Sequence, residues 1–245
     1  AMLRGGGEQG ENALIKLGER WLSEGRAREG VAQLPRQLDA FQCEPALDVL
    51  ERLFDQAEEL ERLEQLLRRR VVLEKTALGR GRALEKLASF EQDLRRDTAA
   101  AIAAFFAAAD AYSQARERDD AERAYQRLLD LSPDHADAAS RLVALRAQAG
   151  DFAGVGSAFG VVLRATDDNR VASELLLSVA RDAERASAAE EFAELADNVL
   201  WRLSSEEREL SERLLRESAV LFGAQARYDE AAELYRRLIA DRATS

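Results

Sequence analysis

The chain has 245 residues, and 47% of them are hydrophobic, which is enough to bury a core and excludes global disorder. Its 46 acidic and 35 basic side chains give a formal net charge of −11, which repels phosphate backbones and argues against nucleic acid as a partner. Its single cysteine, Cys43, and single histidine, His135, exclude an internal disulfide and most metal or acid–base constellations. We therefore expect no metal, no cofactor and no enzymatic activity.

Strong helix formers dominate the composition, because Ala, Leu, Glu and Arg are abundant while only three prolines interrupt the chain. No Gly-rich phosphate loop follows a strand, because the sequence shows no strand pattern. The sequence therefore predicts an all-α protein.

The N-terminal part has an irregular helical pattern. Residues 1–10 contain three consecutive glycines and are predicted to form a flexible lead-in. In residues 11–97, a first helix stripe comprises Leu14, Leu17, Gly18 and Trp21, and a partial one comprises Leu47, Leu50 and Phe54. We expect degenerate helix pairs there.

A run of three arginines, Arg68 to Arg70, follows several glutamates. The spacings Glu58–Arg62 and Glu64–Arg68 suit ion pairs on the surface of one helix, so we interpret the run as a solvated face rather than an anion site. Three later spacings have the same interpretation: Glu209–Arg213, Glu212–Arg216 and Glu233–Arg237.

The segment from residue 95 to residue 118 can be paired in two ways. Residues 99–112 form either the first helix of a pair with the following segment or a second helix packed on residues 84–94. Strict alternation of first and second helices cannot hold on both sides of this segment. We therefore expect a junction here.

From residue 98 to residue 245 two apolar stripes repeat every 34 residues. One stripe opens at Ala121, Val155 and Ala189, with further members four and seven residues later. The other opens at Phe105, Ala139 and Ser173. Two interleaved stripes with one period predict stacked antiparallel helix pairs.

These residues resemble the tetratricopeptide repeat family. The match is good from Phe105 to Pro133, where aromatic and small residues alternate on the two helices, and weaker from Ala139 to Asp167, where Arg146 stands in place of a tyrosine. A further copy ends the chain, 42 residues after the previous one, which predicts an insertion near residues 204–211. The resemblance implies a right-handed α-solenoid of about 12–13 helices.

The resemblance also implies that the first helices line a concave face that holds a peptide or helix of a partner protein. Residues off the packing stripes of those helices are then the candidate contacts: Phe106, Asp110, Arg141, Ala144, Gln148, Glu174, Ser178, Arg181, Arg213 and Arg216. We expect a non-catalytic scaffold or adaptor.

Two alternatives remain open. The chain can be a self-assembling helical module, and large apolar residues near Leu234 and Ile239 on the outer face of the last helix would favour that alternative. It can also be the regulatory segment of a larger multidomain protein.

The remaining distinctive residues are interpreted as structural. Trp21 and Trp201 are expected in the core, His135 in an exposed turn, and Cys43 in a turn without a redox role. The chain shows no apolar run of membrane-spanning length and no secretory leader, which predicts a cytoplasmic protein without membrane insertion.

Overall fold

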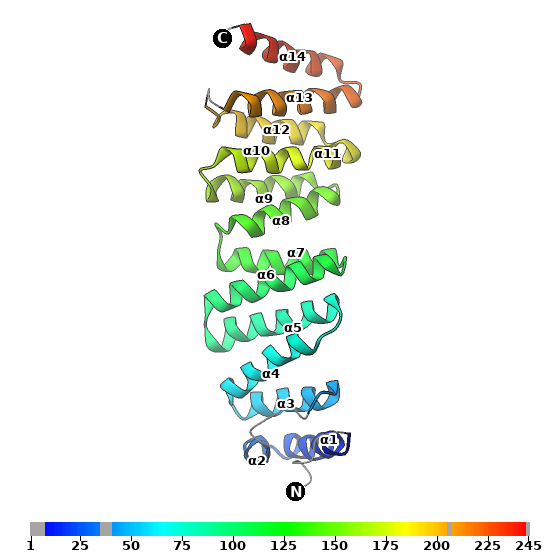
Figure 1. Cartoon of the computed structure of the whole chain (residues 1–245), viewed down its shortest axis with the longest axis vertical. Coiled ribbons are helices and arrows are strands. Elements are labelled where there is room, and N and C mark those ends of the chain that lie inside the picture. The colour runs from blue at the N-terminus through cyan, green and yellow to red at the C-terminus, as the bar shows by residue number, and fades with distance from the viewer. Residues whose placement is uncertain (1–7, 35–40, 205–206, 244–245) are drawn as a thin grey trace. The chain divides into compact units, whose positions relative to one another are not determined.

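The computed structural model describes residues 8–34, 41–204 and 207–243, and within them the chain is all-α. Fourteen α-helices and one π-helical turn lie along these ranges, and none of the described residues forms a strand. Figure 1 labels the α-helices in chain order. They are α1 (Glu8–Ser23), α2 (Ala27–Gln33), α3 (Glu44–Gln56), α4 (Leu60–Leu73), α5 (Ala77–Phe90), η2 (Glu91–Arg95), α6 (Thr98–Gln114), α7 (Arg118–Leu131), α8 (Ala136–Gln148), α9 (Phe152–Ala165), α10 (Asn169–Ser178), α11 (Ala180–Ala186), α12 (Ala189–Leu200), α13 (Arg208–Ala224) and α14 (Tyr228–Ala243).

The chain divides into two compact units, with the boundary inside α7 between Ala124 and Tyr125. The predicted grouping into residues 11–97 and 98–245 concerns repeats rather than compact units and stays a prediction. The predicted lead-in falls partly outside the described residues, which begin at Glu8, the first residue of α1.

Helix pairs are the building blocks of both units, and their tight turns share one backbone feature. A residue in the left-handed region separates the two helices of each pair, since its positive φ reverses the chain. These residues are Gly25, Glu58, Arg116, Gly150, Ser187 and Ala226. Arg116 lies in the turn between α6 and α7, and the packed pairs are α1–α2, α3–α4, α8–α9, α10/α11–α12 and α13–α14.

In the first unit, α5 packs on both α4 and α6. A Cβ atom added to Gly81 of α5 would lie 2.8 Å from carbons of the Tyr112 ring on α6. After α5 the helix widens into η2, and Arg96 ends it in the left-handed region. The pairing of residues 99–112 with residues 84–94 is confirmed, because α6 packs on α5. The pairing with the following segment involves α7, which contains the boundary between the two units, and stays a prediction.

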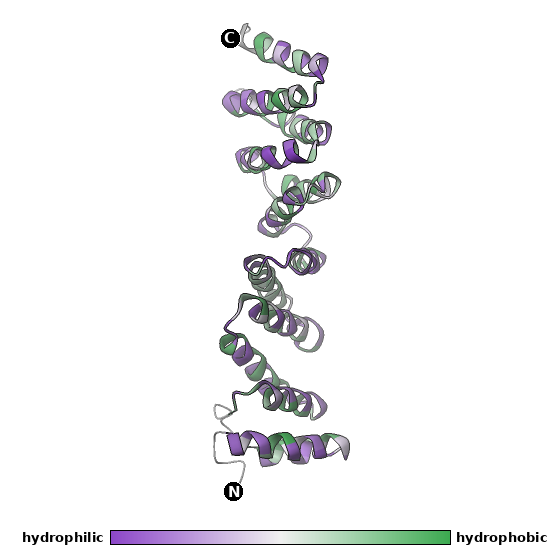
Figure 2. Ribbon diagram, turned by 90° about the vertical axis from the view of Figure 1, so that its right-hand side faces the viewer, coloured by the Kyte–Doolittle hydropathy of each residue, from purple (hydrophilic) through white to green (hydrophobic). Residues whose placement is uncertain are grey.

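In the second unit the repeating stripes form the core. Val155, Phe159 and Val162 of α9 are fully buried, as are Ala139 and Val143 of α8. Arg146, which interrupts the expected tyrosine position, extends across the pair, and its Nη1 donates to the carbonyl oxygen of Gly154 at 2.9 Å. Figure 2 shows the resulting alternation of hydrophobic and hydrophilic residues around the helices. The prediction of stacked all-α helix pairs is confirmed.

One first helix is interrupted, which adds to the predicted count of about 12–13 helices. The backbone N–H of Val179 donates to the carbonyl oxygen of Leu176, so a tighter turn replaces the α-helical bond and separates α10 from α11. The predicted insertion near 204–211 lies between the end of α12 at Leu200 and the first turn of α13, and Ser205 and Glu206 are outside the described residues.

The interpretations of Arg70 as solvated and of Trp201 as a core residue are wrong. Arg70 is not solvated: it is buried, and its Nη1 lies 2.7 Å from a carboxylate oxygen of Asp48 and 2.7 Å from one of Glu51. Trp201 is not in the core but 89% exposed, because α12 ends at Leu200 and the stripe does not continue beyond it. Trp21 is buried as predicted.

His135 and Cys43 both precede helices. His135 is half-buried rather than exposed, and its Nδ1 accepts from the backbone N–H of Ala138, which caps α8. Burial raises the pKa of the Cys43 thiol above its ordinary value.

Several ion pairs connect residues on two different helices rather than residues one turn apart on the same helix. Of the predicted pairs, Glu64–Arg68 forms at 2.9 Å, but Glu58 lies in the turn before α4 and pairs with Arg28. Arginines of α13 and α14 behave similarly: Arg213 pairs with Glu174 of α10 at 2.7 Å, and Arg237 with Asp197 of α12 at 3.2 Å. In the first unit Arg52 of α3 pairs with Glu19 of α1, and Lys86 of α5 with Glu51 of α3. Glu19–Arg52, Glu174–Arg213 and Asp197–Arg237 connect equivalent helices of neighbouring helix pairs.

Glu91 gives the first unit a predictable pH dependence. It is 3% exposed, and burial, followed by the nearby Glu64 carboxylate, raises its pKa despite an ion pair with Arg68 at 3.0 Å. The folded chain therefore holds the Glu91 proton more tightly than the unfolded chain. Its contribution to the free energy of unfolding is lost as pH rises from the ordinary carboxyl range through the raised pKa.

Glu91→Gln is expected to remove this loss, so its stability relative to the natural chain should be higher at neutral pH than at acidic pH. Urea unfolding at several pH values measures the difference. Glu209→Gln, which changes an exposed carboxylate on α13, is the matched control. An identical trend in both variants would contradict the assignment to Glu91.

Candidate partner-binding face

The candidate face lies on the first helices of the second unit. α13 packs against both α10 and α11, and α11 packs against α8, so the first helices are neighbours. Off their buried stripes these helices present Arg141, Ala144 and Gln148 on α8, Val171, Glu174 and Ser178 on α10, Arg181 on α11, and Arg213, Arg216 and Val220 on α13. We call these ten residues the first-helix face.

An ion pair connects the α10 and α13 residues of the first-helix face. The Nη1 atom of Arg213 lies 2.7 Å from a Glu174 carboxylate oxygen, which joins α13 to α10. Residues three or four positions away lie on the same side of a helix. Val171 and Ser178 therefore flank Glu174, and Arg216 flanks Arg213.

Three arginines of the face have no ion-pair partner within the described ranges. Arg141, Arg181 and Arg216 are exposed and come from three successive first helices. An exposed guanidinium without an ion-pair partner keeps its N–H donors available for a carboxylate. Arg213 is different, because Glu174 already occupies it and raises its pKa.

Two further residues of the face were missed by the sequence interpretation. Val171 and Val220 are large apolar side chains that are about half exposed. Both lie outside the buried stripes of their helices, and this sequence position could have identified them as exposed apolar residues. They give the face apolar contact area beside its charges.

Two candidate contacts lie elsewhere, on α6 of the first unit. Phe106 and Asp110 are both half-buried. Of the predicted contacts, the structure thus brings together those of α8, α10, α11 and α13, while these two belong to the other compact unit.

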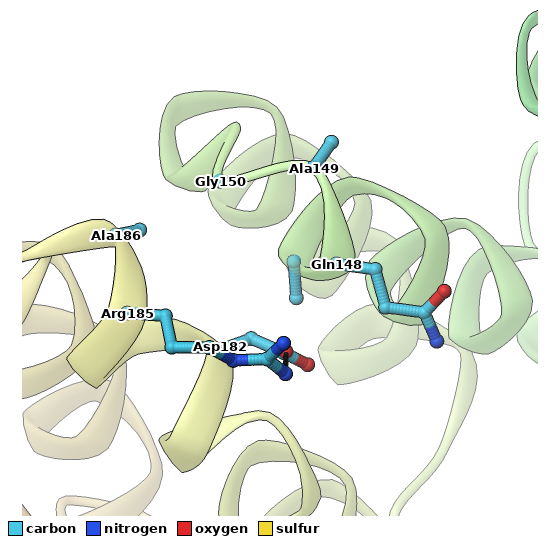
Figure 3. Close-up of a pocket in the computed structure, with 7 residues that line it drawn as sticks. Gln148, Ala149, Gly150, Asp182, Arg185 and Ala186 are labelled. Atoms are coloured by element: carbon cyan, nitrogen blue, oxygen red, sulfur yellow. Dashed lines mark hydrogen bonds and ion pairs between the residues drawn. The ribbon is translucent and has the colours of Figure 1, made fainter.

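A hollow of about 250 Å³ opens at the ends of α8 and α11. Figure 3 shows Gln148 and Gly150 on one side of it and Asp182, Arg185 and Ala186 on the other. The Arg185 guanidinium is ion-paired with Asp182. Gln148 thus links the first-helix face to this polar hollow.

The strongest polar cluster of the first unit is structural. The hydroxyl of Tyr112 donates to Glu85 at 2.7 Å, and Arg123 pairs with Glu85 and Asp120. Burial and the Glu85 carboxylate raise the pKa of Tyr112 well above its usual range, so the group remains a phenol. It fastens α6 to α5 and provides no activated nucleophile.

Across the described ranges, no cluster of three or more His, Cys, Asp or Glu side chains could hold a metal ion. No helix described is long and apolar enough to cross a membrane.

Comparisons with known proteins agree with the helix-pair architecture at the level of one repeat. Residues 104–139 match the family described as tetratricopeptide repeat. Among curated proteins, none matches this sequence.

Several solved structures are similar in outline. The MamA RS-1 ArsTM double mutant is 17% identical, with 78% of this chain and 96% of that chain covered and a TM-score of 0.40. BtubC (BKLC) from P. vanneervenii is 14% identical over 96% and 91% of the two chains, with a TM-score of 0.41. A tetratricopeptide repeat protein from Parabacteroides merdae ATCC 43184 is 15% identical over 95% and 93%, with a TM-score of 0.40. At TM-scores below 0.5 none of these likenesses supports an inference about function.

The match at residues 104–139 covers part of α6, all of α7 and the start of α8, where the 34-residue stripes begin. This segment is similar to a tetratricopeptide repeat.

Proposed function

We propose that the chain is a non-catalytic scaffold that binds a segment of a partner protein on the first-helix face. The observation that carries this proposal is that Arg141, Arg181 and Arg216, on three successive first helices, are exposed and have no ion-pair partner among the described residues. Tetratricopeptide repeat proteins as a class bind other proteins.

The chemistry of the face defines the partner segment. Arginines spaced over three helices suit a segment with several carboxylates, because each planar guanidinium can take two parallel hydrogen bonds. Val171 and Val220 favour apolar side chains between those carboxylates. A peptide or a helix of mixed acidic and apolar character meets both requirements.

The test is capture of a partner by the natural chain and by Arg141→Glu/Arg181→Glu, followed by titration of the purified partner. Reversing two charges that contact carboxylates is expected to weaken binding at least about tenfold. Arg82→Glu/Arg164→Glu has the same net charge change on exposed arginines outside the face and should bind normally. Equal affinity of all three proteins would reject the proposed face.

In the alternative of a regulatory segment, the first-helix face binds a segment of the same protein rather than of another protein. This alternative requires the partner segment to belong to another part of a longer protein. Binding of the purified partner segment to the 245-residue chain tests the face in either context. The cytoplasm remains our predicted compartment.

A further inference from the structure

The last helix of the second unit carries an uncovered apolar stripe. Tyr228 is 71% exposed, Tyr235 43% and Ile239 67%, and Ala232 between them is half-buried. Their spacings of four, three and four residues place all four on one flank of α14. The adjoining flank of α14, with Ala231 and Leu238, is buried, and α14 packs on α13.

In α9, two of the four positions that correspond to the α14 stripe are buried. Counted from the stripe openings Val155 and Ala231, the residues of α9 that correspond to the α14 stripe are Phe152, Gly156, Phe159 and Leu163. Phe152 and Phe159 are buried, and α9 packs on α10 and α12. The α14 stripe therefore has the register of a helix-packing surface, and the structure leaves it open.

The spacing of the four stripe residues indicates which partner can pack on α14. A four-three-four series reads the same in both directions, so two α14 helices can pack antiparallel about a two-fold axis between residues 233 and 234. Tyr228 then faces Ile239 of the other copy. Tyr235 faces Ala232 of the other copy, which places a large side chain against a small one.

The charges beside the stripe fit the same arrangement. Asp229 and Arg236 lie on the solvent side of the stripe, are exposed and have no ion-pair partner within the described ranges. In an antiparallel pair, positions of this kind on the two helices approach each other. Asp229 of each copy would thus meet Arg236 of the other copy, which gives two reciprocal ion pairs.

We propose that the chain forms a homodimer through antiparallel α14 helices, with Tyr228, Ala232, Tyr235 and Ile239 in its centre and Asp229–Arg236 pairs at its edge. This assembly goes beyond the partner-binding function and uses none of the first-helix face. One helix pair buries less than the roughly 1,200 Å² of a stable standard interface, so we expect a dimer that dissociates on dilution.

Sedimentation equilibrium over a wide concentration range tests the dimer. The natural chain should show a monomer–dimer equilibrium, and Ile239→Glu should raise its dissociation constant at least about tenfold. A natural chain that stays monomeric throughout would overturn the proposal.

Charge reversal then tests the orientation with variants whose changes are on the surface. Asp229→Arg and Arg236→Asp should each weaken self-association, because each opposes like charges twice. A mixture of the two variants should associate as tightly as the natural chain, since every reversed charge then meets its complement. If the mixture stays as weak as the separate variants, or if neither variant alters self-association, the antiparallel arrangement is wrong.

Discussion

Phe159→Ala is expected to lower the free energy of unfolding by about 3 to 5 kcal/mol. The side chain is fully buried in α9, and its truncation removes apolar contacts and leaves a cavity between neighbouring helix pairs. Urea unfolding followed by far-UV circular dichroism measures the change.

Tyr235→Ala is the matched control, because Tyr235 occupies the same register position in α14 but is 43% exposed. Its cost should be less than half that of Phe159→Ala when the chain is measured as a monomer. Equal losses would show that burial by the next helix pair does not govern this position.

Gly81→Ala is expected to destabilise the first unit by about 1 to 3 kcal/mol. The added methyl group would lie 2.8 Å from the Tyr112 ring, which cannot move aside easily because it is buried and bonded to Glu85. Either α5 and α6 separate or this hydrogen bond breaks.

Gly160→Ala makes the same change in the middle of α9, where the nearest atom to the new Cβ is Nη1 of Arg164 at 3.6 Å. Here alanine should stabilise by about 0.5 to 1 kcal/mol, because it has the better helix propensity. Opposite signs for the two substitutions in thermal unfolding support the close crossing. A gain at Gly81 would contradict it.

The helix pairs could be predicted from the sequence because their stripes bury residues at a constant spacing. The 34-residue period identified Val155 and Phe159 as core, and both are fully buried. The turns were harder. Four of the six left-handed turn residues are not glycine, so the residue types alone do not mark their conformation.

The sequence interpretation was weakest for charged and terminal positions. Arg70 looks like its exposed neighbour Arg68, but only the placement of α4 on α3 buries it among carboxylates. Trp201 follows a buried stripe and still lies outside, since the helix ends one residue earlier. Such outcomes depend on where a helix stops and on what packs beside it, and neither is encoded in a local pattern.

The ion pairs between equivalent helices have a mechanical consequence. Glu19–Arg52, Glu174–Arg213 and Asp197–Arg237 each connect two neighbouring helix pairs. Exposed pairs of this kind contribute about 0 to 1 kcal/mol and weaken as salt screens them. Ionic strength therefore tunes the bending stiffness of each unit at its joints, while the apolar packing inside every hairpin keeps its own rigidity.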